Sequence, residues 1–91
     1  MAVTLSHAYG SVLLVEEDAE IAARGKKFFL EWGNRVDVVS TPLAGYVRLA
    51  GCHGYNKVVI AARMMDPKRK DLKLLTMSPA EAIKKLWGLC L

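Results

Sequence analysis

The segment VVIAA at residues 58–62 has the apolar, branched pattern of a buried strand, and two methionines and an Asp-Pro pair follow shortly after it. In open α/β sheets, ligands and reactive groups meet at the carboxyl ends of the strands. At that place this chain has Ala61 and Ala62, and alanine carries no group that can act as a nucleophile, a base or a ligand. The segment is therefore either an active-site strand without its chemistry or an ordinary strand of the core.

The densest group of charges lies just beyond this strand, in the segment PKRKDLK. Its four basic residues are Lys68, Arg69, Lys70 and Lys73. Such a group can bind nucleic acid or an acidic partner, or it can form a solvated loop that keeps the chain soluble. The 91-residue chain has 13 basic and 9 acidic residues, and its formal net charge of +4 permits a nucleic-acid partner without requiring one. No helix-turn-helix, zinc or RNA-recognition motif accompanies the group.

The other reactive side chains form no catalytic set. His7 and His53 have no partner at a recognised spacing, and Cys52 and Cys90 do not have the spacing of metal ligands. Two free thiols without a secretory signal indicate a reducing compartment. No apolar run approaches the roughly 20 residues of a membrane span. We therefore expect a cytoplasmic protein that is not an enzyme, uses no cofactor and does not bind a membrane.

The hydrophobic pattern predicts one α/β domain at residues 11–91, after an N-terminal arm or edge strand at 1–10. Strands are expected at 11–15, 35–39, 57–61 and 72–76, and helices within 16–33, 42–50 and 79–91. The unbroken apolar run at 11–15 favours a central strand, and the alternation at 35–39 favours an edge strand. Thr41 and Ser78 are expected to cap the second and third helices, each followed by a proline in the first helical position.

The order of the first elements predicts parallel pairing, because a strand, a helix and a second strand form a right-handed crossover. The third connection is different. Only about ten residues separate the third and fourth strands, whereas a parallel crossover usually needs a dozen or more. The fourth strand is therefore expected to run antiparallel, to join through an irregular crossover, or to exchange with a partner chain.

Three segments together resemble the receiver domain of two-component response regulators: VLLVEEDAEIA, LEWGNRVDVVST and YNKVVIAARMMDP. That family typically has an apolar strand ending in two or three acidic residues, and a later strand ending in Asp-x-Met-Met-Pro. The match covers residues 11–67. The resemblance implies a three-layer, flavodoxin-like sandwich with a mostly parallel sheet, shortened here to about four strands and three helices.

The family's chemistry is phosphoryl transfer to an aspartate after the third strand, assisted by Mg²⁺ that the acidic residues hold. By this resemblance the acidic cluster falls on Glu16, Glu17 and Asp18, the acceptor position on Ala62, and the family's hydroxyl residue on Thr76. Ala62 cannot accept a phosphoryl group. The acidic cluster is then either a weak metal site or a set of charges that favours the start of a helix.

These observations predict a pseudo-receiver that is not phosphorylated and that acts in protein interaction, oligomerisation or regulation. Hydrophobic residues make up 53% of the chain, which is high for a small domain and favours a homodimer, although another protein is a possible partner. The expected dimer surface on the last helix consists of Ile83, Leu86, Trp87 and Leu91. The alternative is a small basic protein that binds nucleic acid through the loop at 68–73.

Overall fold

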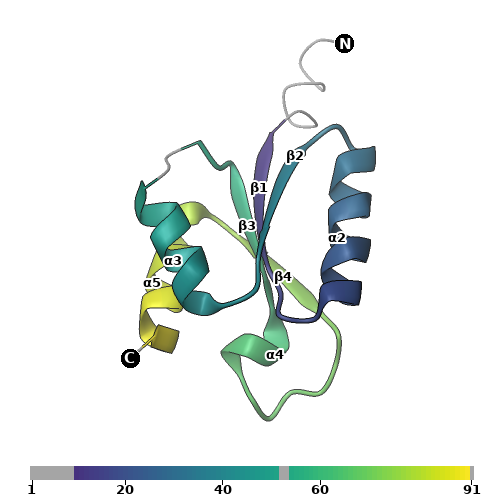
Figure 1. Ribbon diagram of the computed structural model, residues 1–91. Coiled ribbons are helices and arrows are strands. Elements are labelled where there is room, and N and C mark those ends of the chain that lie inside the picture. The colour runs from purple at the N-terminus through teal and green to yellow at the C-terminus, as the bar shows by residue number, and fades with distance from the viewer. Residues whose placement is uncertain (1–9, 52–53, 91) are drawn as a thin grey trace.

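The computed structural model describes residues 10–51 and 54–90 and has the predicted α/β architecture (Figure 1). The strands are β1 (Ser11–Val15), β2 (Arg35–Val39), β3 (Lys57–Ala61) and β4 (Leu74–Met77). The helices are α2 (Ala19–Glu31), α3 (Pro42–Gly51), α4 (Ala62–Met65) and α5 (Pro79–Cys90). The expected arm at 1–10 lies outside the described residues, apart from Gly10.

The sheet is mixed, with the strand order β2-β1-β3-β4. β1 pairs in parallel with β2 and β3, whereas β4 runs antiparallel to β3. The segment between β3 and β4 contains only the single turn of α4, which is too short to cross back over the sheet. This resolves the direction that the sequence left open. It also corrects two details, since the fourth strand begins at Leu74 rather than at residue 72, and α4 was not expected.

Helices cover both faces of the sheet (Figure 1). α2 packs on one face against β1 and β2, while α3 and α5 pack against each other on the opposite face. The side chains of β1 and β3 therefore alternate between two core clusters, of which Leu13 and Ile60 represent one and Leu14 and Val59 the other. Burial on both faces explains why these two strands are continuous apolar runs.

The ends of the helices follow the predicted caps. Thr41 Oγ1 accepts a hydrogen bond from the Ala44 amide at 3.1 Å, and Ser78 Oγ accepts one from the Glu81 amide at 3.2 Å. Gly33 ends α2 with φ 84°, a left-handed conformation that glycine adopts without a steric cost. Both expected caps are confirmed.

α2 approaches the sheet closely at Gly25. A Cβ at this position would lie 3.1 Å from Leu14 Cδ2 and 3.4 Å from Leu74 Cδ1. The missing side chain therefore lets the helix lie directly on β1 and β4, which explains a glycine in the middle of a helix despite its cost of about 1 kcal/mol relative to alanine.

Several large apolar side chains stay outside the core, as the composition predicted. The most exposed are Phe28, Trp32, Leu43, Val47, Leu72 and Trp87. Within the described residues, no helix is both long and apolar enough to cross a membrane.

Candidate functional site

The carboxyl ends of β1 and β3 bring Glu16 and Arg63 together. Glu16 directly follows β1, and Arg63 lies in the turn of α4 that directly follows β3. Because these two strands are parallel neighbours, their ends meet at one edge of the sheet. Arg63 Nη2 lies 2.5 Å from Glu16 Oε1 and donates a hydrogen bond to it. The Glu16 side chain is 0% exposed and that of Arg63 is 20% exposed, so this is a buried ion pair.

The Glu16 carboxylate is held in a fixed position. Its Oε1 atom also accepts a hydrogen bond from the Asp18 amide at 3.0 Å, and the backbone amide of Glu16 donates to the Val39 carbonyl. Within the described residues, Glu16 Oε2 and Arg63 Nε are buried without a hydrogen-bond partner. A cation supplied by the chain itself therefore neutralises the carboxylate at this edge.

Ala62, the expected acceptor position, is buried at the same edge. Its amide donates a hydrogen bond to the Lys73 carbonyl at 2.9 Å, which joins the end of β3 to the segment before β4. The methyl group offers no nucleophile, so this edge carries a carboxylate and a guanidinium but no phosphoryl acceptor at the predicted position.

The three acidic residues that follow β1 have separate environments. Glu16 is paired with Arg63, Glu17 is exposed, and Asp18 Oδ1 caps α2 by accepting hydrogen bonds from the amides of Glu20 and Ile21. No group of three histidine, cysteine or acidic residues that could hold a metal ion occurs in the part of the chain that the structure describes. For Asp18, the geometry favours the role at the start of the helix over the role of a metal ligand.

Thr76, on which the family's hydroxyl residue falls by the resemblance, does not lie opposite the end of β3. Because β4 runs antiparallel to β3, Thr76 pairs with Val59, and it is Leu74 that lies opposite the end of β3 at Ala61. A parallel fourth strand would end at the edge where Ala62 lies, but the reversed strand carries its hydroxyl away from it.

Neither a protein-family model, nor a curated protein, nor a solved structure matches this chain. The buried pair at the edge of the sheet can hold a conformation, and its carboxylate and guanidinium neutralise each other.

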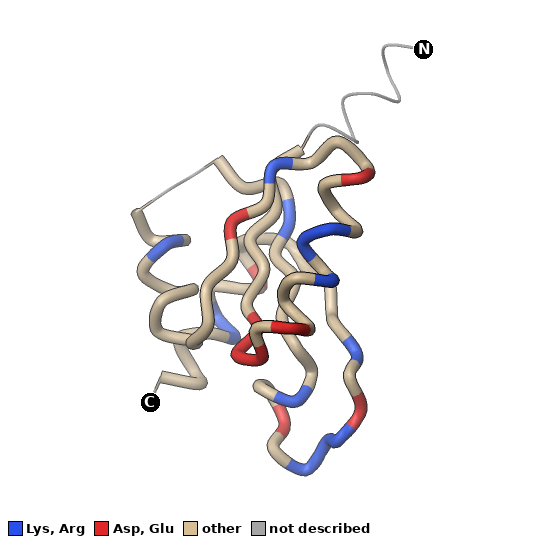
Figure 2. Tube along the Cα trace, turned by 45° about the vertical axis from the view of Figure 1, so that its right-hand side comes forward, with Lys and Arg blue, Asp and Glu red and all other residues tan. Residues whose placement is uncertain are grey.

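The basic loop also carries acidic residues that contact its basic residues or backbone. Its basic residues are Lys68, Arg69, Lys70 and Lys73, and Figure 2 shows acidic residues interspersed among them. Arg69 Nη2 lies 2.7 Å from Asp71 Oδ2, and this hydrogen bond raises the pKa of Arg69 and lowers the pKa of Asp71. Asp66 Oδ1 accepts a hydrogen bond from the Lys68 amide. The acidic residues therefore offset part of the charge of the loop.

The expected dimer surface on α5 is divided by the fold. Trp87 is 50% exposed and packs against Tyr46 of α3, with ring centroids 5.0 Å apart, and Ile83 is half-buried beside them. Leu86 is 0% exposed and belongs to the core, which corrects its assignment to an outer surface. Leu91 lies outside the described residues. The α5 surface therefore consists of Trp87 and its immediate neighbours.

Of the other reactive side chains, the structure describes only one. Cys90 is an exposed free thiol near the end of α5. His7, Cys52 and His53 lie outside the described residues.

A second polar cluster, which sequence reasoning missed, joins β2, α3 and the segment before β3. The Tyr55 hydroxyl donates a hydrogen bond to Asp37 Oδ2 at 2.6 Å and accepts one from Arg48 Nη1 at 3.2 Å. Arg48 Nη1 also lies 3.4 Å from Asp37 Oδ2. Burial and the hydrogen bond to Asp37 raise the pKa of Tyr55. The three residues are far apart in the sequence and follow no recognised spacing, so no local signal could have found them.

We expect Tyr55→Phe to lower the free energy of unfolding by about 0.5–1.5 kcal/mol, because the hydrogen bond to Asp37 is lost.

The raised pKa of Tyr55 leads to a second prediction, on the pH dependence of stability. Above pH 10 the unfolded chain loses its phenolic proton before the folded chain does, so the stabilisation falls as the pH rises through the folded pKa. Urea unfolding at pH 8 and at pH 11 measures both effects. Tyr46→Phe is the matched control, and a Tyr55→Phe variant with the same pH dependence as the wild type would contradict this reading.

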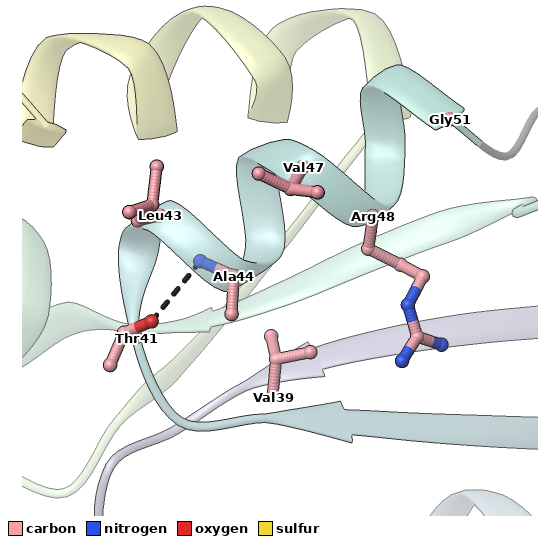
Figure 3. A pocket seen from close by; sticks show the side chains of 7 residues that line it. All are labelled: Val39, Thr41, Leu43, Ala44, Val47, Arg48 and Gly51. Atoms are coloured by element: carbon pink, nitrogen blue, oxygen red, sulfur yellow. Dashed lines mark hydrogen bonds between the residues drawn. The ribbon is translucent and has the colours of Figure 1, made fainter.

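An apolar groove lies beside this cluster, between α3 and the edge formed by β2 (Figure 3). Its lining residues are Val39, Thr41, Leu43, Ala44, Val47, Arg48 and Gly51. Arg48 reaches from α3 toward the strands at one end of the groove, while Val39 and Ala44 face each other near its centre. The groove is open and mostly apolar, a composition typical of a surface that contacts another protein.

Proposed function

We propose that this protein is a non-catalytic, receiver-like module that acts by protein interaction or self-association and is not phosphorylated. The observation that carries the proposal is the buried ion pair of Glu16 and Arg63 beside Ala62. A phosphoryl acceptor site needs an acceptor carboxylate and carboxylates that are free to hold Mg²⁺. Here alanine stands at the acceptor position, and Arg63 pairs with the buried carboxylate of Glu16.

In this proposal Arg63 takes the place of a bound cation beside the Glu16 carboxylate. A buried carboxylate without a cation is strongly unfavourable, and Arg63 supplies that cation permanently. The α/β scaffold is thereby stabilised without a bound metal, which is what a module that serves only as an interaction scaffold requires.

Incubation with a small phosphoryl donor and Mg²⁺, followed by intact mass measurement, tests the proposal. We expect no added mass, because Ala62 has no nucleophilic atom. A phosphorylatable receiver domain treated in parallel serves as the positive control. Phosphate on Glu17, Asp18 or Asp66 would contradict the proposal.

The interaction part of the proposal is supported by the exposed apolar groups and by the two outer strands, β2 and β4, whose edges no other described strand pairs with. Light scattering during size-exclusion chromatography tests self-association, and a strict monomer at high concentration would contradict it. Binding of nucleic acid through the basic loop has weaker support, because Asp66 and Asp71 offset part of the charge of that loop.

A further inference from the structure

We propose that two copies of this chain associate through β2, whose free edge pairs antiparallel with β2 of the second copy to form one continuous sheet. The inference deepens the proposed self-association and rests on it. Four observations carry it: the outward-facing backbone groups of β2, the charges at Arg35 and Asp37, the exposure of those side chains, and the apolar groove beside the strand.

Among the residues that the structure describes, β2 is an outer strand of the sheet and pairs with β1 alone. The Arg35 amide donates to the Gly10 carbonyl, and the Val39 carbonyl accepts from the Glu16 amide. Since the hydrogen-bonding direction alternates along a strand, Asp37 also faces β1, whereas the amides and carbonyls of Val36 and Val38 point outward. An edge of this kind can accept a further strand without disturbing the existing sheet.

The outward-facing residues limit the register of such a pair. In an antiparallel pair, residues that exchange hydrogen bonds stand directly opposite each other, so Val36 must face an outward-facing residue of the second copy. If Val36 faces Val36 of the second copy, Arg35 of each copy stands opposite Asp37 of the other, which gives two pairs of opposite charge. These two positions do not exchange hydrogen bonds, and at such positions the side chains of neighbouring strands come closest.

The neighbouring registers bring like charges together. A pair centred on Asp37 places two carboxylates opposite each other, and a pair centred on Arg35 does the same with two guanidinium groups. Directly opposite like charges destabilise a sheet, whereas opposite charges stabilise it. The other edge strand, β4, has no charged residue between Leu74 and Met77, so no comparable pattern selects a register there.

The surroundings of β2 are compatible with this pair. Arg35 is exposed, and the Asp37 side chain is 42% exposed although it already accepts a hydrogen bond from Tyr55. The carboxylate can therefore lie between Arg48 of its own chain and Arg35 of the second copy. The apolar groove flanks the strand on one face of the sheet, and Val38 is partly exposed on the other, so apolar surface is available on both sides of the joined strands.

Sedimentation-equilibrium measurements on charge variants test the proposal. We expect a wild-type dimer, and we expect Arg35→Asp to raise its dissociation constant roughly tenfold or more, because two attractive pairs become repulsive. Arg35→Lys retains the charge and should keep the constant within roughly threefold of the wild type. Lys85→Asp, on the exposed side of α5, is the matched control and should have no effect.

A second variant removes the backbone contribution. Val38→Pro deletes an outward-facing amide but none of the bonds to β1, so it should weaken the dimer while β1 and β2 remain paired. Circular dichroism and urea unfolding at low concentration check that each variant is folded.

The outcomes separate this inference from the proposed function. A wild-type chain that is monomeric at every concentration overturns this pairing and the self-association part of the proposed function. A dimer that Arg35→Asp leaves intact overturns the pairing through β2 alone, and if Trp87→Lys then breaks that dimer, the α5 surface is the interface and self-association stands.

Discussion

Arg63→Ala should lower the free energy of unfolding by about 3 kcal/mol, near the lower end of the range measured when one partner of a buried ion pair is removed. The substitution leaves the Glu16 carboxylate buried at the edge of the sheet with a single hydrogen bond, from the Asp18 amide. The side chain of Arg63 retains some exposure, so water can reach part of the site and the cost stays below the maximum. Small domains have only about 5–15 kcal/mol of stability, so a large share would be lost.

Urea unfolding of the wild type, Arg63→Ala, Arg69→Ala and a double methionine variant measures the loss of stability and shows whether the unpaired carboxylate causes it. Arg69→Ala removes one partner of an exposed surface pair and should change the free energy of unfolding little. The double variant Glu16→Met with Arg63→Met replaces both charges by apolar side chains, and we expect it to be more stable than Arg63→Ala. If Arg63→Ala were no more harmful than Arg69→Ala, the buried pair would not contribute to stability and the main support for the proposed function would be lost.

Leu86→Ala is expected to lower the free energy of unfolding by about 2–5 kcal/mol, because it removes a wholly buried side chain and leaves a cavity. Leu86 packs into the space left by the glycine in α3, since a Cβ on Gly45 would lie 3.1 Å from Leu86 Cδ1. Gly45 has no side chain that could fill the cavity left by Leu86→Ala. We therefore expect the loss of unfolding free energy to lie in the upper part of this range.

The adjacent Trp87 provides the comparison. Trp87→Ala removes a larger side chain, but this side chain is half exposed, and its main aromatic contact is Tyr46. We expect a loss of about 1 kcal/mol. Urea midpoints at low protein concentration separate these effects on folding from any effect on association. Equal losses from the two substitutions would show that α5 is packed differently from the arrangement described above.

The parts of the fold that depend on local pattern were predictable from the sequence. β1, β2 and β3 begin and end where their apolar patterns placed them. Thr41 and Ser78 predicted the starts of two helices because each cap is a contact with an amide three residues away. The direction of β4 could not be chosen from the sequence, since the short connection was compatible with several arrangements.

The contacts that form the candidate site were not predictable. Arg63 and Glu16 are 47 residues apart, and no periodicity links the end of one strand to the turn after another. The cluster of Asp37, Arg48 and Tyr55 was not predictable for the same reason, because its members are far apart in the sequence. Leu86 was assigned to an outer surface because helical spacing identifies apolar positions without showing whether the protein's own core or a partner covers them.

The reversal of β4 also changes the electrostatic field at the edge where Glu16 and Arg63 lie. α2 and α3 begin at this edge, and each contributes the partial positive charge of a helix amino terminus. α5 follows the reversed strand, so it ends at this edge and contributes a partial negative charge instead (Figure 1). In an all-parallel α/β sheet, every helix would direct its positive end here and favour a phosphate group. The macrodipole of α5 opposes that attraction, so the topology itself makes this edge a weaker binding place for anions.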